Sequence, residues 1–328
     1  MVPKALPRGI LVIGICSLLW WALRTLQGSY AVFAESLQSI DLLSPTLDHD
    51  WKTSELYAFK ATHDLCSAHG YSAFVPKSPS RERKIYDMLM INDELDFLEI
   101  RLDALYDYVD YFIIAESAKT FQANSKPLIL KDNWDRFRRY HDKVMYHELT
   151  FPSSFDPHRP WDYEDLQRDA PFDQVMLHLD GPRAPNKGDV LVVADVDEIP
   201  RPQTLLILQY CNFPRRLTLS SKFYYYSFQF LHAGPEWQHS QATYYQGHQT
   251  LKPTNLRNGD GGFRPLRFLE RGVLIREGKD LWGREQDQFV RIENNKDMPP
   301  LVLRQPKRFG YMISRDGLSA GFVDYSGN

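Results

Sequence analysis

The sequence contains little cysteine, which limits how disulfides or metal could hold the fold together. Only three cysteines occur in 328 residues, and Cys16 lies within an apolar run near the start. The other two, Cys66 and Cys211, are too few for a disulfide-based scaffold, and no Cys-x-x-Cys spacing indicates a zinc site. They could form one disulfide in a secretory lumen or remain two buried thiols, and the sequence leaves both possibilities open.

A surplus of basic residues is also missing. Lys and Arg number 39 against 42 Asp and Glu, which gives a net charge of −3. A protein that binds a nucleic-acid backbone needs excess positive charge, so we expect no nucleic-acid partner. The chain has no Asn-x-Ser/Thr sequence for N-glycosylation and no internal repeat. Its length and its 43% hydrophobic content are enough for one large domain or two small ones.

The one long hydrophobic run extends from Ile10 to Leu23, with basic residues at positions 4 and 8 ahead of it. This pattern indicates a membrane-targeting segment whose N-terminus stays in the cytoplasm and whose C-terminal side enters the lumen. A cleaved signal peptide is the alternative, because Val32-Phe33-Ala34 is a passable cleavage site; we favour an uncleaved type II anchor. The expected organisation is a cytoplasmic tail at 1–8, a transmembrane signal anchor at 9–27, a stem or linker at 28–80 and a globular domain at 81–328.

Beyond residue 80, segments with helical and strand patterns alternate, which predicts an α/β fold. Helices are expected at Leu95–Leu105, Asn133–Tyr140, around Glu164 and Arg168, from Pro202 through Leu208, and at Leu281–Ile292. Strands are expected at Tyr111–Ala115, Val144–His147, Val190–Ala194, Arg216–Ser221 and Phe223–Phe230. Glu164 and Arg168 are four residues apart on one helix, so we interpret them as a surface ion pair.

The stretch GDVLVVADVDEIPRP, residues 188–202, contains the most distinctive chemical pattern. Leu191 to Ala194 predict a buried strand, and side-chain alternation would place Asp195 and Asp197 on one face at its C-terminal end. Ligands of open α/β sheets bind at that end. Paired carboxylates there favour a hard divalent cation, Mn²⁺ or Mg²⁺. The alternative is an ordinary polar exit from a strand into a turn.

An α/β fold, an Asp-x-Asp at a strand end and a lumenal position together suggest a nucleotide-sugar transferase. A phosphatase of the haloacid-dehalogenase type also begins with an apolar strand and Asp-x-Asp. That family has a small Thr or Val two places after the second Asp, whereas Ile199 and Pro200 follow here. The phosphatase is therefore the less favoured hypothesis.

Longer motifs give a more specific indication. They include KIYDMLMINDELDFLEIRLDALYDYVDYFIIAESAKTF, KPLIL, GDVLVVADVDEIPRP, LTLSSKFYYYSF, GKDLWGRE and GFVDY. With these motifs the chain resembles glycosyltransferase family 17, and especially its fungal members, over residues 83–262 and 276–325. The resemblance implies a GT-A fold, a UDP-sugar donor, a glycoprotein N-glycan as acceptor, transfer of N-acetylglucosamine or a similar sugar with inversion, and residence in the Golgi membrane.

The resemblance also implies donor-binding residues. The first sheet strands of similar enzymes end at the nucleotide, which makes Glu116 and Ser117 candidate donor contacts. Arg101 and Lys126, in neighbouring family motifs, are candidates for the diphosphate charge. The alternatives are that Glu116 caps a turn and that Arg101 is a charge on a helix surface.

The acceptor side is less defined. Aromatic residues that could stack on sugars, or pack in the core, are Tyr224, Tyr225, Tyr226 and Trp237. An inverting transfer needs a carboxylate base, and the candidates are Glu236, Asp260, Glu285 and Asp287.

One departure from the family concerns this side. Family members carry a Gly-Trp-His-Cys-Ser block followed by Ser-Phe-Ser-His, whereas here Gly262 leads into FRPLRF and the last histidine is His248. Either this chain has lost part of its site, or the sequence omits coding sequence around Gly261 to Arg271. We therefore keep a second hypothesis, a catalytically silent member that binds a nucleotide sugar or a partner. We also expect the acceptor side to be open or poorly ordered between residues 259 and 279.

Overall fold

The structure is a computed structural model that describes residues 51–76, 82–257 and 289–316. The chain divides into two units, residues 1–60 and 61–328, and apart from the start of its first helix everything described below belongs to the second. Within the described residues, no helix has the length and apolarity needed to cross a membrane. The predicted tail at 1–8, the anchor at 9–27 and the segment 259–279 lie outside them.

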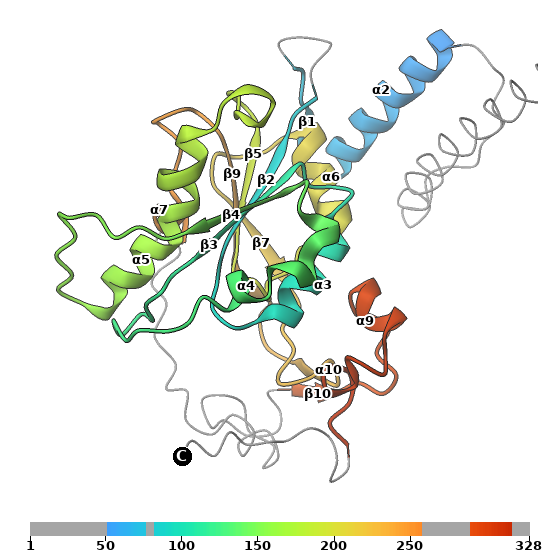
Figure 1. The fold of residues 1–328 in the computed structure, drawn as a ribbon. Coiled ribbons are helices and arrows are strands. Elements are labelled where there is room, and N and C mark those ends of the chain that lie inside the picture. Colours follow the sequence, from blue (N-terminus) through green and yellow to red (C-terminus); the bar gives the residue numbers. More distant parts are fainter. Residues whose placement is uncertain (1–50, 77–81, 258–288, 317–328) are drawn as a thin grey trace, which may run out of the picture. The chain divides into compact units, whose positions relative to one another are not determined.

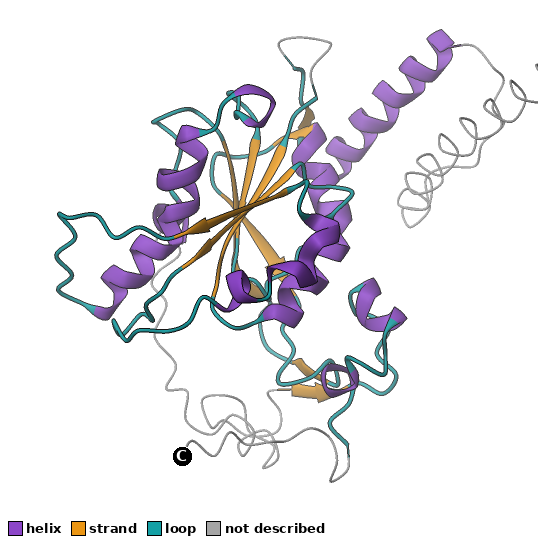
Figure 2. Ribbon diagram, viewed as in Figure 1, coloured by secondary structure: helices purple, strands orange, loops and turns teal. Residues whose placement is uncertain are grey.

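A mixed sheet forms the centre of the domain (Figures 1 and 2), and its described strands have the order β4-β3-β2-β5-β9-β7. Their bounds are β2 (Ile85–Ile91), β3 (Tyr111–Glu116), β4 (Val144–Glu148), β5 (Val190–Val193), β7 (Leu217–Ser221) and β9 (Trp237–Tyr244). Strands β2 to β5 are mutually parallel, while β9 runs antiparallel to both β5 and β7. This arrangement confirms the α/β prediction.

The central strands are continuous apolar runs because helices cover both sheet faces. On one face Leu89, Phe112 and Val192 pack against helices α3 (Leu95–Leu105) and α6 (Pro202–Tyr210). On the other face Met88 and Leu191 pack with residues that follow α5 (Pro160–Ala170) and with α7 (Pro253–Arg257). Figure 1 shows α5 and α7 on the opposite side of the sheet from α3 and α6.

Short elements connect these layers. They are α4 (Ile129–Asp132), a 3₁₀ helix at Trp134–Tyr140, a π-helical turn at Pro171–Val175, and 3₁₀ turns at Met176–His178 and Gly181–Arg183. The segment predicted as a helix near Asn133–Tyr140 is thus helical, in the tighter 3₁₀ form. The strands predicted near residues 111, 144, 190 and 216 are all present.

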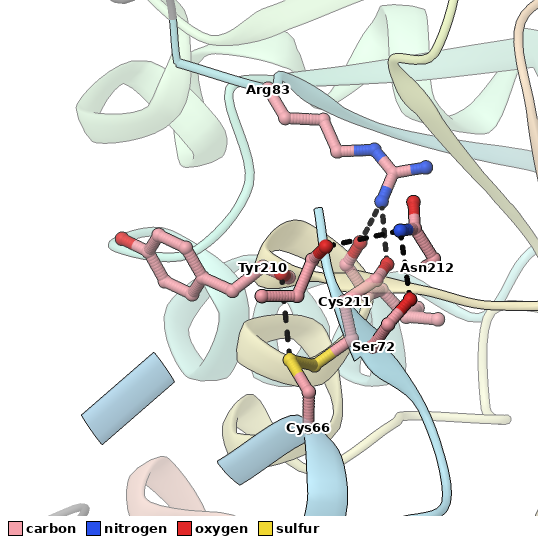
Figure 3. The surroundings of a disulfide bond; sticks show 8 residues. Cys66, Ser72, Arg83, Tyr210, Cys211 and Asn212 are labelled. Atoms are coloured by element: carbon pink, nitrogen blue, oxygen red, sulfur yellow. Dashed lines mark hydrogen bonds between the residues drawn. A yellow bond between two sulfur atoms is a disulfide. The ribbon is translucent and has the colours of Figure 1, made fainter. Parts of the chain in front are cut away.

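Part of the predicted stem has regular structure. Helix α2 (Trp51–Ala68) is followed by the two-residue strand β1 (Ser72–Ala73), which pairs antiparallel with β6 (Cys211–Asn212). A disulfide joins Cys66 to Cys211 (Figure 3), which decides between the two possibilities that the sequence left open. Within the predicted stem or linker at 28–80, the part at 61–73 therefore has regular structure, and a covalent bond and a strand pair attach it to the end of α6 and to β6.

Arg83 stabilises the same region, at the end of the sheet where strands β2 and β5 begin. Its Nη1 donates to the carbonyl oxygens of Leu208, at 2.9 Å, and of Cys211, at 2.8 Å. Its guanidinium also lies over the rings of Phe74 and Phe213, at 4.2 and 4.9 Å from their centroids. The disulfide and this arginine hold the end of α6 far from the carboxyl ends of the strands.

The C-terminal part differs from two predictions. The segment 223–230 forms turns, and only β8 (Phe230–His232) is a strand; it pairs with β10 (Phe289–Arg291). The helix predicted at 281–292 is therefore wrong at 289–291, and its first part lies outside the described residues. Helices α9 (Pro300–Arg304) and α10 (Gly310–Ile313) follow, and they bury Leu301, Phe309 and Met312 against Ile100 of α3.

Candidate functional site

The sheet order itself indicates where a ligand binds. Strands β3 and β4 lie on one side of β2, and the next parallel strand, β5, lies on the other. The chain therefore reverses its direction of winding between β2 and β5. Open α/β sheets bind ligands in the crevice at the carboxyl ends of the two strands that flank such a reversal. Here these ends lead into the loop at 92–94 and the turn at 194–198.

The turn after β5 carries the carboxylates. β5 ends at Val193, so Asp195 and Asp197 lie beyond the strand and do not share a strand face as the sequence suggested. The Glu198 N–H donates to the Asp195 carbonyl at 3.0 Å, and the Asp195 N–H donates to Glu198 Oε2 at 2.8 Å. The turn is closed at both ends and Asp197 lies within it. Since side-chain alternation applies only within a strand, it could not predict this geometry.

Two arginines donate hydrogen bonds to the carboxylate of Asp195. Arg168 Nη1 donates to Oδ1 at 2.8 Å, and Arg257 Nη2 donates to Oδ2 at 3.0 Å. Burial would raise the pKa of Asp195, but these two positive charges outweigh it and lower the pKa to about 2. Arg168 also donates to Glu164 at 2.8 Å. Its side chain is only 8% exposed, so the predicted surface pair is in fact part of this buried network.

Glu198 connects the turn to the other side of the sheet. Its Oε2 accepts from Arg257 Nη1 at 3.0 Å, and its Oε1 accepts from the indole N–H of Trp237 at 2.7 Å. Trp237 begins β9, whose pairing with β5 brings it beside the turn. Glu198, Arg168 and Arg257 were not among the residues that we predicted for the site. The only available signal was the third acid in Asp-Val-Asp-Glu, because both arginines come from distant helices.

Asp197 differs from its neighbours because its charge is not neutralised. It is exposed, and within the described part of the chain no side chain donates to its carboxylate. Although it reaches solvent, the dense protein around the turn removes part of its hydration, and the charges of Asp195 and Glu198 act on it as well. Together they raise its pKa to about 6. A free carboxylate in this setting fits a cation.

The carboxylates alone do not form a complete cage. Among residues 51–76, 82–257 and 289–316, no group of three or more His, Cys, Asp or Glu side chains is arranged to hold a metal ion. A cation at the turn would therefore take most of its oxygen ligands from water or from a bound ligand, as Mg²⁺ commonly does at phosphate sites.

Arg101 lies beneath the turn and not on the helix surface. Its side chain is fully buried and forms a bidentate pair with Asp87 of β2, with both N–O distances 2.7 Å. Its Nη1 donates to the carbonyl oxygens of Asp195, at 3.0 Å, and Glu198, at 2.9 Å. These contacts give Arg101 a structural position that supports the turn, so we do not include it in the surface offered to a ligand.

Glu116 also has internal partners. Its carboxylate accepts hydrogen bonds from the backbone N–H groups of Leu130, at 2.8 Å, and Lys131, at 3.1 Å, in α4. The Tyr146 hydroxyl donates to it at 2.9 Å. The structure thus agrees with the capping alternative. Ser117, which follows, is buried, and its Oγ accepts from the Lys119 N–H at 3.0 Å.

Lys126, another residue predicted to contact the nucleotide sugar, differs from Arg101 and Glu116 in its surroundings. Its Nζ is buried and, within the described residues, makes no hydrogen bond. Burial lowers its pKa, against the opposing charges of Glu116, Glu94 and Asp93. Glu94 also acts on Asp197, so electrostatic coupling links the loop after β2 to Lys126 and to the carboxylate turn. An unpartnered ammonium beside the crevice fits an anionic ligand.

The four aromatic residues that were candidates for sugar stacking lie in different surroundings and do not form one surface. Tyr225 is buried, whereas Tyr224 donates to Asp297 at 3.3 Å. Tyr226 has a left-handed backbone, with φ of 62°, and its ring lies under the Arg315 guanidinium. Only Trp237 reaches the carboxylate turn. Of the candidate bases, Glu236 precedes Trp237 and is exposed, while Asp260, Glu285 and Asp287 lie outside the described residues.

Comparison with known proteins gives a family and a partial relationship. The model of the family described as Glycosyltransferase family 17 matches residues 44–263. Two similar proteins, from Rattus norvegicus and Homo sapiens, are both named Beta-1,4-mannosyl-glycoprotein 4-beta-N-acetylglucosaminyltransferase. They are 29% and 28% identical over 160 residues, and each alignment covers 43% of this chain. It covers only 29% of each relative's length.

A solved structure, "Mannosyltransferase PcManGT from Pyrobaculum calidifontis in complex with GDP-Man and Mn2+", has 15% sequence identity to this chain. The alignment covers 46% of this chain and 37% of that one, with a TM-score of 0.26. This similarity is too low to establish a common fold.

Proposed function

The chain belongs to glycosyltransferase family 17, and on that basis we propose that it transfers N-acetylglucosamine, or a similar sugar, from a UDP donor to an N-glycan hydroxyl such as that of a β-mannose. The main structural support is the crevice between β2 and β5, where neither the Asp197 carboxylate nor the Lys126 ammonium has a side-chain partner in the part of the chain that the structure describes. A metal-bound diphosphate carries both kinds of complementary charge. The family match covers the carboxylate motif and so favours this hypothesis over a haloacid-dehalogenase phosphatase.

We propose a fold of the GT-A type for residues 81–328. The parallel strands β4-β3-β2-β5 form a nucleotide-binding half with its ligand crevice at the switch between β2 and β5. Antiparallel β9 then brings Trp237 of the acceptor half beside the carboxylate turn, and Glu236 immediately precedes it in the chain. The donor and the acceptor would thereby meet at one edge of the sheet.

Within this site, the Asp195–Asp197 turn is the proposed position of Mn²⁺ or Mg²⁺, and Lys126 the proposed diphosphate contact. When bound, such a cation stabilises the negative charge that develops on a departing nucleoside diphosphate. Glu116 ends β3 and Ser117 begins the loop that leads to Lys126. Their side chains shape the donor side by accepting hydrogen bonds from the backbone of α4 and from the Lys119 N–H. For the base that removes the acceptor proton, Glu236 is the candidate within the described residues.

We also propose residence in the Golgi membrane as a single-pass type II protein, with the globular domain in the lumen. The Cys66–Cys211 disulfide supports an oxidising compartment, since structural disulfides are rare in the cytosol. The basic residues ahead of the apolar run support the orientation.

One observation supports the second hypothesis, that the chain is a catalytically silent member of the family. The family match ends at residue 263, at the point where the sequence lacks the Gly-Trp-His-Cys-Ser block. A chain that retains donor contacts but has lost acceptor contacts would bind a nucleotide sugar, or a partner, without turnover.

Calorimetry with UDP and Mn²⁺ tests the donor site, using Lys126→Met and a matched control, Lys131→Met. Loss of a charged hydrogen bond to phosphate costs about 1.5–3 kcal/mol, so Lys126→Met should weaken UDP binding roughly 10- to 100-fold. Lys131 is exposed and pairs with Glu148, so its variant should bind UDP normally. Because Lys126→Met also removes a buried ammonium without a partner, it should melt at a higher temperature. Equal UDP affinities in the two variants would contradict the donor assignment.

A further inference from the structure

The segment between β10 and α9, residues 292–299, lies beyond the part of the chain that the family model matches. Its residue Asp297 contacts two elements beside the candidate site. Arg201 comes directly before α6, and Lys222 begins the β7–β8 connection, residues 222–229. Figure 1 shows this connection next to β10 and α10. A carboxylate that joins the two elements can fix their relative position.

Both oxygens of the Asp297 carboxylate accept hydrogen bonds. Arg201 Nη2 donates to Oδ1. Lys222 Nζ donates to Oδ2 at 2.8 Å, and the Tyr224 hydroxyl donates to the same oxygen at 3.3 Å. Partial burial would raise the pKa of Asp297, but the hydrogen bonds from Lys222 and Arg201 outweigh it, so the pKa lies below its ordinary value. The residue is therefore ionised at neutral pH.

The same segment is attached to the far end of the β7–β8 connection as well. The Asn295 side-chain amide donates to the Phe228 carbonyl at 2.7 Å. The Ile292 N–H donates to the Gln229 carbonyl, also at 2.7 Å. Asn295 in addition accepts from the Asp297 N–H at 2.8 Å, which fixes the backbone next to the carboxylate. The connection is thus held at its first and its last residues by one segment.

Phe223 links this attachment to the candidate site. It lies between Lys222 and Tyr224, the two residues that donate to Asp297. Its ring stacks on that of Trp237, with the centroids 5.0 Å apart and the planes at 21°. The Trp237 indole N–H in turn donates to Glu198 of the carboxylate turn. A displacement of the start of the connection would therefore change the surroundings of the indole that contacts the turn.

We propose that Asp297 is a positioning residue. It holds the β7–β8 connection against the start of α6, and thereby places Trp237, and through it Glu198, at the crevice from the acceptor side. The paired side chains Arg201 and Lys222 are 66% and 50% exposed, and pairs of exposed charges add little stability. The main effect of Asp297 is therefore on geometry. This inference deepens the proposed function, and its effect on UDP binding rests on that function.

The indole N–H resonance of Trp237 reports the bond to Glu198 directly. It is observed in full-length protein labelled with nitrogen-15, and it is identified by its loss in Trp237→Phe. We expect Asp297→Asn to shift this resonance upfield, towards that of an indole that bonds only to water. Glu293→Gln is the matched control, because Glu293 belongs to the same segment and pairs with Arg291 of β10. It should leave the resonance unchanged.

Two further variants separate positioning from general damage to the fold. Asp297→Glu keeps the charge and should return the resonance towards its wild-type position. Lys222→Gln removes one donor at an exposed side chain, so it remains informative if Asp297→Asn does not fold. It should shift the resonance in the same direction, and the double variant should shift it little further, because both residues act through one contact.

Calorimetry with UDP and Mn²⁺ measures the effect on binding. Residues that act on a site without touching its ligand change affinity by a factor of about 2 to 30. We therefore expect Asp297→Asn to weaken UDP binding within that range, and Glu293→Gln to weaken it less than about twofold.

The possible failures can be distinguished. An unchanged Trp237 resonance in folded Asp297→Asn would overturn the inference, and so would an equal shift in Glu293→Gln, because the whole segment and not this carboxylate would then be responsible. A shifted resonance with unchanged UDP affinity would also overturn it. A wild type that binds neither UDP nor Mn²⁺ would instead remove the proposed function, whereas the resonances would still decide whether Asp297 positions Trp237.

Discussion

Arg101 shows how much one side chain contributes to the site without facing it. It is a fully buried charged residue that joins Asp87 of the central strand to two carbonyl groups of the carboxylate turn. A buried ion pair of this kind is weak support for stability by itself, because both charges lose their hydration. Its effect here is geometric, since it determines where the turn lies relative to β2.

Replacing Arg101 with Ala should therefore destabilise the fold. The change leaves Asp87 charged, buried and unpaired, which typically costs about 3–5 kcal/mol of unfolding free energy. Urea denaturation followed by circular dichroism measures this loss. Arg138→Ala is the matched control, because its pair with Asp135 is highly exposed and should contribute within about 1 kcal/mol. If Arg101→Ala weakened UDP binding at unchanged stability, the sequence-based role of a direct diphosphate contact would be favoured.

At the residue scale, the sequence located charged groups but not their partners. Glu116 and Arg101 lie in the motifs that led us to select them, yet both are saturated by residues from other elements, such as Tyr146 and Asp87. A motif shows that a charge is near the crevice, but burial and pairing are decided by contacts between distant parts of the chain. Lys126 has the same kind of sequence signal, and only the structure shows that its ammonium lacks a hydrogen-bond partner among residues 51–76, 82–257 and 289–316.

At the scale of elements, the disulfide attaches α2 to the end of α6, away from the carboxyl ends of the strands. Cys66 and Cys211 are separated by 145 residues, so the bond should restrict the unfolded chain strongly. The double variant Cys66→Ser with Cys211→Ser should lose about 2–4 kcal/mol of unfolding free energy. UDP affinity, measured by calorimetry below the melting temperature, should stay within about threefold of wild type. The reason is that the proposed crevice lies at the carboxyl ends of the parallel strands, whereas the disulfide lies near the ends where those strands begin. A large loss of affinity in the folded variant would show that the disulfide also shapes the site.

Helices α9 and α10 are attached to α3 by charge as well as by apolar packing. Arg308 bonds to Asp96 at 2.9 Å and to Glu99 at 2.7 Å, and the Tyr311 hydroxyl donates to Asp96 at 2.6 Å. Partial burial would raise the pKa values of both acids, but hydrogen bonds, from Tyr311, Arg136 and Arg308 to Asp96 and from Arg308 and Arg136 to Glu99, outweigh it. Both pKa values therefore lie below their ordinary values.

The sign of the pH dependence follows. A carboxylate with a lowered folded-state pKa contributes stability above its unfolded pKa and loses that contribution as the pH falls through the folded value. Arg308→Ala should thus lower the melting temperature by roughly 2–4 °C at pH 7, for about 1 kcal/mol, and the difference should shrink as the pH falls below about 4. Calorimetric scans at several pH values measure it, with Lys307→Ala as the exposed control. A difference that does not depend on pH would assign the effect to packing.

The quality of the sequence prediction at this scale depended on how each element is stabilised. Strands β3 and β5 are buried on both faces, so their apolar runs identified them. Strand β2 is buried in the same way, but it was not predicted. Helix α2 has no strong apolar stripe, and β8 with β10 is only three residues long. Their stability comes from a disulfide, from ladder hydrogen bonds and from tertiary contacts, none of which a local pattern contains.

At the scale of the molecule, the candidate residues for donor binding and for acceptor binding come from different parts of the sequence. Lys126, Asp195 and Asp197 all precede residue 198, whereas Trp237 and Glu236 follow it. The sequence predicted an α/β fold and the edge at which ligands bind, because these follow from the alternation of elements. It could not predict that Arg168 and Arg257 would meet at Asp195, since that depends on how α5 and α7 pack across the sheet.

This division predicts that donor binding and sugar transfer will separate. The proposed donor contacts all lie before residue 198, but the sequence lacks the Gly-Trp-His-Cys-Ser block that family members carry after residue 262. We expect UDP to bind in the presence of Mn²⁺, while transfer of N-acetylglucosamine to an N-glycan acceptor is much slower than donor hydrolysis, or absent. The reason is that an acceptor held in the wrong position loses the large advantage of oriented attack. Parallel measurement of free sugar and of glycan product from radiolabelled UDP-N-acetylglucosamine gives the ratio, with Asp197→Asn as the control that should abolish both. Glycan product formed at an ordinary enzymatic rate, on the order of 1 to 1000 per second, would mean that the missing block is not needed for acceptor binding.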